Sequence, residues 1–281
     1  MPLEIKRCPD LISAKNNPLV VRLGKLEEKK HREREGLFRL DGIKLLLEAL
    51  KFGADIEYIL VREDAFSHVM RSVDEFLDKI NVYSSGTLVV LGKTAFDKLS
   101  DEKSPEGVIT VVKYIHRLHK RYEEENCKLC SDGEKMFMLE SVRDPGNMGT
   151  ILRSAAAFGI DTVIMTEDCA DIYNPKTLRA AMGAIFKIKT IKIRSAGEAI
   201  ADLQKNGRKV LAAALDKDAK RLGDVPLSPS DVFLIGNEGH GLSNEAIAAA
   251  DQSIFIPMAE NTESLNAAVA ASICLWEISK T

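Results

Sequence analysis

The first 115 residues alternate between helical and extended patterns of apolar positions. Leu19, Leu23 and Leu26 recur at the spacing of one helix face, and other segments are short runs of apolar and β-branched side chains. The pattern predicts helices over residues 17–31, 43–52 and 67–80, and strands over residues 36–40, 56–61, 88–91 and 107–112. We therefore expect a small α/β domain over residues 1–115.

Residues 116–134 differ in character from the segments on either side. The run HRLHKRYEEENCKLCSDGE is almost entirely polar and shows no apolar period. Such composition is typical of a connection between two domains. We expect this segment to be the linker.

A second alternation of strands and helices occupies residues 135–281. Its strands are predicted over residues 136–140, 162–165, 186–193, 209–214, 232–235 and 253–256, and its helices over residues 149–158, 175–184, 196–206, 244–250 and 264–279. Several strands are apolar throughout, as in sheets covered on both faces. The pattern predicts a doubly wound parallel sheet, in which ligands bind beyond the carboxyl ends of the strands.

Composition and charge narrow the class of protein. The 281 residues are 45% hydrophobic and 29% charged, with a net charge of −3. This is a globular composition of about two-domain length. The charge balance disfavours binding of nucleic acid through a general cationic field, although it leaves room for a local basic patch.

Features that mark export or membrane insertion are not visible in the sequence. The first ten residues hold no apolar stretch of the secretory type, and the apolar run 267–276 is shorter than the roughly 20 residues that a membrane span needs. The five cysteines are an odd number, which argues against a disulfide framework. We expect a cytoplasmic protein with no membrane partner.

The first loop with candidate chemistry runs from Arg143 to Arg153 and joins a strand to a helix. Pro145 and Gly146 favour a turn, and Asn147 is well placed to cap the helix. Arg153 follows one to two turns inside that helix. Taken alone, this segment also fits an ordinary turn with a capped helix.

The second loop, residues 235–242, places three glycines within six residues directly after a strand. The order is G-x-x-G-x-G, which differs from the dinucleotide-binding G-x-G-x-x-G. Gly236 and Gly241 allow close approach of the backbone to a ligand, and Glu238 places a carboxylate at the strand end. A tight turn without a ligand is the alternative.

The third loop, residues 256–267, begins with Ile256-Pro257-Met258 and leads into a helix of small residues. Ser264 is expected to be the N-cap, which places Leu265 and Asn266 in the first helical turn. We expect Asn266 to be buried, where an amide is rarely kept for packing alone.

Taken together, the three loops resemble the SpoU/TrmH family of RNA ribose 2′-O-methyltransferases, of the SPOUT superfamily. The family patterns N-x-G-x-x-x-R, G-N-E-G-x-G-L and I-P-M…S-L-N all match here in order and spacing. The resemblance is strong over about residues 135–281. It implies a deep trefoil knot in this domain, S-adenosyl-L-methionine as cofactor, a homodimer, and no metal. By position, it implies that the cofactor contacts are Gly236, Gly241, Ile256, Met258, Leu265 and Ala268.

The resemblance also implies the reaction and its residues. The expected activity is methylation of a ribose 2′-hydroxyl in structured RNA, with ribosomal RNA as first choice. Transfer RNA, or a non-catalytic RNA-binding protein on the same fold, are the alternatives. The catalytic residues carried over by position are Asn147, Arg153, Glu238, Ser264 and Asn266. Residues 1–115 resemble the ribosomal-protein-like substrate-binding domain of the family.

Two other patterns suggest different chemistry. His116, His119, Cys127 and Cys130 are four zinc-ligand side chains within fifteen residues, so a zinc site in the linker stays open. Residues 86–94 approach a phosphate-binding loop, but five residues rather than four separate the two glycines, and those five are predicted to form a strand. A nucleoside triphosphate site is therefore disfavoured.

Overall fold

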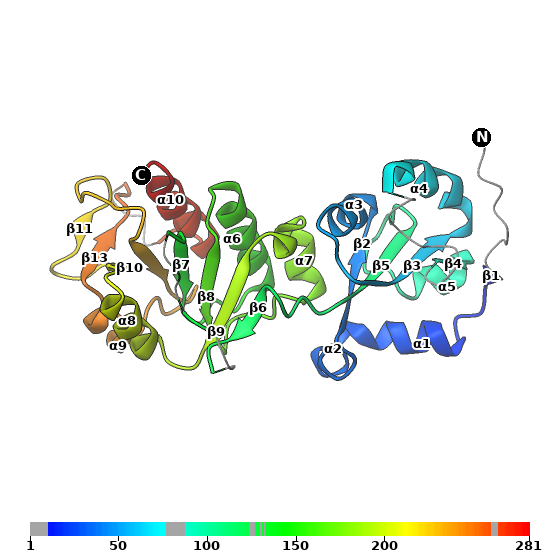
Figure 1. The fold of residues 1–281 in the computed structure, drawn as a ribbon, viewed down its shortest axis with the longest axis horizontal. Helices are drawn as coiled ribbons and strands as arrows, with labels where there is room; N and C mark the ends of the chain where they lie inside the picture. Colours follow the sequence, from blue (N-terminus) through cyan, green and yellow to red (C-terminus); the bar gives the residue numbers. More distant parts are fainter. Residues whose placement is uncertain (1–10, 77–87, 124–126, 130, 132, 260–263) are drawn as a thin grey trace. The chain divides into compact units, whose positions relative to one another are not determined.

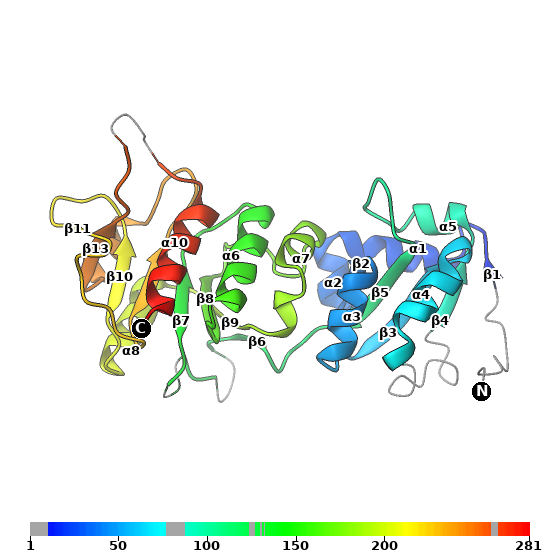
Figure 2. The same cartoon turned by 90° about the horizontal axis from the view of Figure 1, so that it is seen from above.

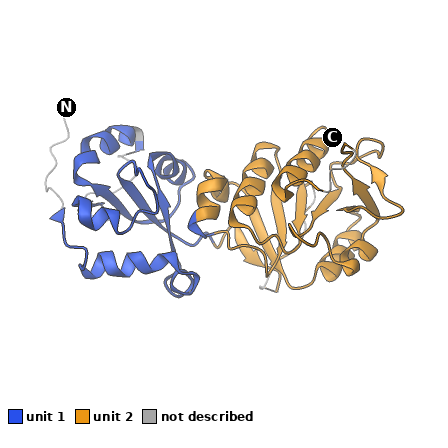
Figure 3. Ribbon diagram, turned by 180° about the vertical axis from the view of Figure 1, so that it is seen from behind, with its two compact units in different colours: residues 1–115, 173–175 blue, residues 116–172, 176–281 orange. Residues whose placement is uncertain are grey.

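The computed structural model describes residues 11–76, 88–123, 127–129, 131, 133–259 and 264–281, which form two compact units (Figures 1 and 3). The first unit comprises residues 1–115 together with 173–175, and the second comprises residues 116–172 and 176–281. Gly86, part of the segment that approaches a phosphate-binding loop, lies outside the described residues.

The first unit is built on a five-stranded mixed sheet in the order β1-β4-β3-β5-β2. Its strands are β1 (Leu11–Ile12), β2 (Leu37–Asp41), β3 (Ile56–Arg62), β4 (Leu88–Leu91) and β5 (Val108–Lys113). Its helices are α1 (Pro18–Gly24), α2 (Lys29–Glu35), α3 (Ile43–Lys51), α4 (Phe66–Ser72) and α5 (Lys93–Asp97). Three 3₁₀ turns, Lys25–Glu27, Glu63–Ala65 and Asp74–Phe76, join some of these elements.

Alternation along β3 explains why this sheet is covered on both faces. Leu60 packs in the cluster that includes α1 and α5, whereas its neighbours Ile59 and Val61 pack in the cluster with α3 and α4. Successive side chains of a strand point to opposite faces, so an apolar run buries both faces at once. The single helix expected over residues 17–31 is instead two helices, because a 3₁₀ turn at Lys25–Glu27 interrupts it.

The second unit contains an eight-stranded sheet in the order β11-β13-β10-β12-β7-β8-β9-β6, and every neighbouring pair is parallel. The strands are β6 (His119–Arg121), β7 (Met136–Leu139), β8 (Thr162–Thr166), β9 (Lys189–Ile193), β10 (Val210–Ala213), β11 (Lys220–Arg221), β12 (Val232–Ile235) and β13 (Gln252–Phe255). This confirms the α/β fold class and the parallel sheet.

Helices cover both faces of this sheet. They are α6 (Pro145–Ala157), α7 (Pro175–Ala181), α8 (Ala196–Lys205), α9 (Asn244–Ala249) and α10 (Ala267–Ser279), with a 3₁₀ turn at Ala184–Phe186. Helices α8 and α9 share one core cluster, whereas α6 and α10 pack together on the other side (Figures 1 and 2). Among the described residues, no helix has the length and apolarity to cross a membrane.

The strand order reverses between β7 and β12. Along the chain, β7 is followed by β8 and β9 on one side, whereas the later strands β10, β12 and β13 lie on the other side. Ligands in such sheets bind at the point where the order reverses, beyond the carboxyl ends of the strands. The loops after β7 and β12 therefore meet at the expected position.

The segment 116–134, which was expected to be a linker, contains a strand of the second sheet. Residues 119–121 form β6, the edge strand that pairs with β9, so the second sheet already begins inside residues 116–134. The backbone N–H of Tyr122 continues the pairing by donating to Lys192 O at 2.9 Å. A polar strand of three residues at a sheet edge leaves no apolar period in the sequence.

Candidate active site

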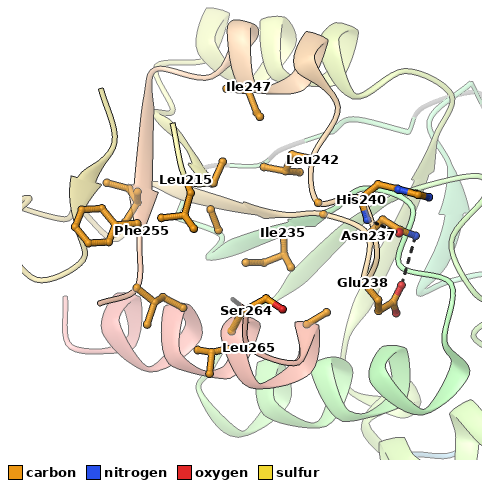
Figure 4. A pocket seen from close by; sticks show the side chains of 18 of the residues that line it. Leu215, Ile235, Asn237, Glu238, His240, Leu242, Ile247, Phe255, Ser264 and Leu265 are labelled. Atoms are coloured by element: carbon orange, nitrogen blue, oxygen red, sulfur yellow. Dashed lines mark hydrogen bonds between the residues drawn. The ribbon is translucent and has the colours of Figure 1, made fainter. Parts of the chain in front are cut away.

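A cavity of about 360 Å³ lies where the carboxyl ends of β10, β12 and β13 meet the start of α10 (Figure 4). Apolar side chains and the glycine-rich second loop form most of its wall. The lining residues are 213–215, 235–242, Ile247, 254–256, Met258, Ser264, Leu265, Ala267 and Ala270. Glu238, Asn237 and His240 stand at one end of the cavity, and Leu215 and Phe255 at the other. The cavity therefore has one polar and one apolar end.

The second loop closes tightly on itself at the polar end. The backbones of Asn237 and Gly241 exchange two hydrogen bonds, with N···O distances of 2.9 and 3.0 Å. A Cβ atom on Gly236 would lie 2.3 Å from the carbonyl carbon of Gly241, and Gly241 itself has a φ of +69°. Position 236 needs glycine because there is no space for a Cβ atom, and position 241 favours glycine because of its positive φ.

Asn237 holds this loop against the segment that follows β7. Its Nδ2 donates to Ser141 O at 2.7 Å, while its Oδ1 accepts from the N–H groups of Gly239 and His240 at 2.8 and 3.2 Å. One side chain thus fixes both the turn and its neighbour. Asn237 belongs to the G-N-E-G-x-G-L motif, but the sequence alone predicted no role for it.

Glu238 is the acceptor on which the first and second loops converge. Its carboxylate accepts from Arg143 N at 3.2 Å, Asp144 N at 3.1 Å and Asn147 Nδ2 at 3.1 Å. Burial opposes ionisation, but the hydrogen bonds from Asn147 and from backbone N–H groups outweigh it and lower the pKa of Glu238. The carboxylate is therefore ionised at neutral pH and is a weak proton acceptor.

Asn147 also bonds to the third loop, through Asn266. Asn266 Nδ2 donates to Asn147 Oδ1 at 3.0 Å, so Glu238, Asn147 and Asn266 form a chain of side-chain hydrogen bonds across all three loops. The Oδ1 of Asn266 accepts from Ala268 N at 2.9 Å and Val269 N at 3.3 Å. Because each amide uses both of its ends, the orientation of both side chains is fixed.

The caps of the two helices differ from those expected. Asp144, not Asn147, caps α6, and its Oδ1 accepts from Asn147 N at 2.8 Å. Asn266, not Ser264, caps α10. The expectation that Asn266 is buried was also wrong, because its side chain lies at the exposed start of that helix. Asp144 directly precedes a proline, and the Asp-Pro pair at cap and first helical position was the sequence signal for it.

The structure brings most, but not all, of the candidate cofactor residues to the cavity. Gly236, Gly241, Ile256, Met258 and Leu265 line it. Ala268 does not line it, because its side chain is buried on α10, where its N–H completes the helix cap. Leu215, which is 70% exposed at the apolar end, was not singled out from the sequence, although it lies two residues after the parallel strand β10.

The candidate catalytic residues fall into three groups. Glu238 and Ser264 line the cavity. Asn147 and Asn266 adjoin it through the hydrogen-bond chain. Arg153 is not brought to the cavity within one chain: it lies on the exposed face of α6, and within the described part of the chain it makes no hydrogen bond or ion pair.

The zinc hypothesis finds no support in the described residues, which contain no group of three or more potential ligands able to hold a metal ion. Both ring nitrogens of His119 already face protein partners, Thr190 Oγ1 at 2.9 Å and Ile185 O at 3.0 Å. Cys127 packs against the core of the second unit, and Cys130 lies outside the described residues.

The cavity fits a nucleoside-type cofactor. Its volume falls within the roughly 300–1,000 Å³ of ligand sites, and its lining combines apolar side chains with the backbone of a glycine-rich loop. Among the described lining residues, only Glu238 and His240 are titratable. Such a lining suits a purine and its ribose. With the parallel sheet and the three motifs, it defines an S-adenosylmethionine-dependent methyltransferase of the SPOUT class.

Comparison with known proteins gives the family. The family model described as the SpoU rRNA Methylase family matches residues 134–276, just over half of the chain, and a model described as an MRM3-like substrate binding domain matches residues 17–110. The chain belongs to the SpoU rRNA methylase family.

Individual relatives are similar over nearly their whole length. The 23S rRNA (guanosine(2553)-2′-O)-methyltransferase RlmP of Bacillus subtilis is 31% identical over 267 residues, which cover 95% of this chain and 98% of that protein. Among solved structures, an RNA methyltransferase of the TrmH family from Porphyromonas gingivalis is 28% identical with a TM-score of 0.75, covering 94% of this chain and 97% of that one. The AdoMet-bound rRNA methyltransferase from Sinorhizobium meliloti is 26% identical with a TM-score of 0.78, covering 96% and 97%.

Proposed function

We propose that this protein transfers a methyl group to the 2′-hydroxyl of a ribose in ribosomal RNA. The observation that carries the proposal is the hydrogen-bond chain from Glu238 through Asn147 to Asn266 at the polar end of the cavity. It joins the three family motifs in one place, next to a cavity that suits the cofactor. The naming of RlmP as a 23S rRNA 2′-O-methyltransferase supports ribosomal RNA as the substrate.

Residues of the second and third loops would hold S-adenosylmethionine. Gly236 and Gly241 offer backbone groups, and Ile256, Met258 and Leu265 offer apolar contact. When bound, the cofactor supplies an electrophilic methyl group. The ribose oxygen would take this methyl group as the S–C bond breaks, and its proton would pass to water, because Glu238 is already occupied by hydrogen-bond donors.

The residues at the polar end would orient the ribose rather than remove its proton. Glu238 is ionised but occupied by four donors, so its role is to hold Asn147 in a fixed orientation. Asn147 and Asn266 present fixed amides beside the cavity, and Ser264 adds an exposed hydroxyl at its mouth. Fixed orientation of the reacting hydroxyl supplies much of the rate of such a transfer.

Arg153 is the group assigned to lower the cost of losing the hydroxyl proton. A guanidinium is protonated throughout the physiological range, so it acts electrostatically, on a phosphate of the RNA and on the developing negative oxygen. Since Arg153 stays outside the cavity of its own chain, a second copy would have to bring it to the site.

The proposed homodimer agrees with an apolar surface on α10. Val269 and Trp276 are 48% and 52% exposed one heptad apart on this helix, and the ring of Phe158 lies 5.7 Å from that of Trp276. Exposed large apolar side chains grouped in this way are typical of protein interfaces. Light scattering on the purified protein should give about twice the mass of the chain, 31.0 kDa.

Residues 1–115 are proposed to bind the RNA, residues 135–281 to carry the transfer, and the cytoplasm to be the compartment. Labelled S-adenosylmethionine, supplied with purified ribosomal RNA or with tRNA, tests the substrate. Incorporation into ribosomal RNA alone supports the proposal, and incorporation into tRNA alone moves the assignment to tRNA. If neither RNA is labelled although the cofactor binds, the chain is a non-catalytic RNA-binding member of the family.

A further inference from the structure

Glu140 is a buried carboxylate that no motif contains. It follows β7 directly and is 9% exposed. Its N–H donates to Ile235 O at 2.9 Å, which extends the pairing of β7 with β12 up to the residue before Gly236. Glu140 therefore lies beneath the start of the second loop.

The side chain of Glu140 reaches past the whole loop and binds its far end. One carboxylate oxygen accepts from Ser243 N at 2.8 Å, and the other accepts from Ser243 Oγ at 2.7 Å. Ser243 is also the N-cap of α9, since its Oγ accepts from Ala246 N at 3.1 Å. Hydrogen bonds to a carboxylate are among the stronger ones in proteins.

Glu140 thus holds both ends of the second loop, residues 235–243. The backbone of Glu140 holds Ile235 before the loop, its side chain holds Ser243 after the loop, and the residues between them close over Gly236. Ile235, Gly236, Gly241 and Leu242 all line the cavity. A change in the separation of the two ends would displace the backbone that forms the cavity wall.

We propose that Glu140 is a positioning residue for the cofactor: by clamping the two ends of residues 235–243, it keeps the cavity in its binding conformation before S-adenosylmethionine arrives. This rests on the proposed function, because it takes the cavity as the cofactor site. Removing the clamp lowers the fraction of molecules in the binding conformation, and the apparent affinity falls by that fraction.

The test measures binding of S-adenosylmethionine to the full-length protein by calorimetry, without RNA. Glu140→Ala should weaken the Kd at least tenfold, which corresponds to about 1.4 kcal/mol. Glu140→Gln should stay within threefold of wild type, because its amide oxygen accepts from Ser243 N and its amide nitrogen donates to Ser243 Oγ. If Glu140→Ala does not fold, Ser243→Ala replaces it, with an expected loss of three- to tenfold.

Ser195→Ala is the matched control. Ser195 caps α8 in the same unit through a bond from Glu198 N at 3.2 Å, and it does not line the cavity. Its loss should lower thermal stability while leaving the Kd within twofold. A purely structural role of Glu140 would reduce the number of binding sites per chain without changing the Kd, and this result overturns the proposal.

Two further outcomes separate the proposal from the function on which it rests. If wild type binds S-adenosylmethionine and Glu140→Ala binds it equally well, the clamp is refuted and the proposed function stands. If wild type itself does not bind S-adenosylmethionine, the proposed function fails, and the clamp fails with it.

Discussion

The two glycines at positions 236 and 239 give a controlled test of how the cavity is built. A Cβ at Gly236 would lie 2.3 Å from Gly241 C, 2.4 Å from Gly241 O and 2.4 Å from Leu242 N. All three atoms belong to the backbone, so no side-chain rotation relieves the overlap. At Gly239, the nearest atom to a Cβ is Asn237 Oδ1 at 3.5 Å, which is an ordinary contact.

The expected effect of Gly236→Ala follows from this overlap. Overpacking of a well-packed site costs typically about 1–3 kcal/mol, and the Gly236 overlap involves three backbone atoms of one rigid peptide unit, so the upper part of that range applies. When the loop bears this cost, the affinity for S-adenosylmethionine falls roughly 30- to 150-fold. Gly239→Ala should stay within about twofold, since it meets no backbone atom.

Calorimetric titration of both variants with S-adenosylmethionine is the assay, and thermal unfolding confirms that each variant is folded. The reasoning is refuted if Gly236→Ala binds the cofactor as tightly as Gly239→Ala, because the close approach of Gly236 to Gly241 would then not shape the cavity.

Three other changes test separate parts of the account. Arg153→Ala should lower methyl transfer at least about 100-fold with the cofactor Kd unchanged, and near-normal turnover would remove Arg153 from the mechanism. Asn266→Ala should cost about 1 kcal/mol of unfolding free energy from the lost cap and reduce transfer more than cofactor binding; an unchanged rate contradicts its role. Burial lowers the pKa of His119 from 6.5 to about 4. The unfolded chain therefore binds this proton first as the pH falls, and stability should drop by about 2 kcal/mol between pH 7 and 5. His119→Gln should show a smaller drop in urea unfolding, and an equal drop would exclude His119 as its source.

The architecture of the second unit was readable from the sequence because parallel strands bury both faces. Runs such as residues 136–139 and 232–235 are apolar throughout, and each leads to a loop that contains glycine and polar residues. The rule that ligands bind beyond the carboxyl ends then identified the second and third loops, which line the cavity, and the first loop, which bonds to the second beside it. The edge strand β6 was not predicted, because its three residues are polar and partly exposed and so show no apolar pattern.

The contacts within the site were less predictable than its position. Asp144 and Asn147, and likewise Ser264 and Asn266, are all good cap residues, and which oxygen faces the first helical N–H groups depends on the direction from which the chain enters the helix. Arg153 lies on an exposed helix face and does not line the cavity of its own chain, which the spacing of the first motif does not reveal. Glu140 bonds to Ser243, 103 positions later in the chain, and a contact over that separation leaves no local pattern in the sequence.

The methyl group is expected on a ribose oxygen, and the chemical identity of the methylated product shows directly whether it is there. The protein would be incubated with ribosomal RNA and deuterated-methyl S-adenosylmethionine, the RNA digested to nucleosides, and the labelled nucleoside identified by mass spectrometry. We expect label in a single 2′-O-methylated nucleoside, and at least about 100-fold less of it with Arg153→Ala. Label on a base, or equal label with Arg153→Ala, would contradict this expectation.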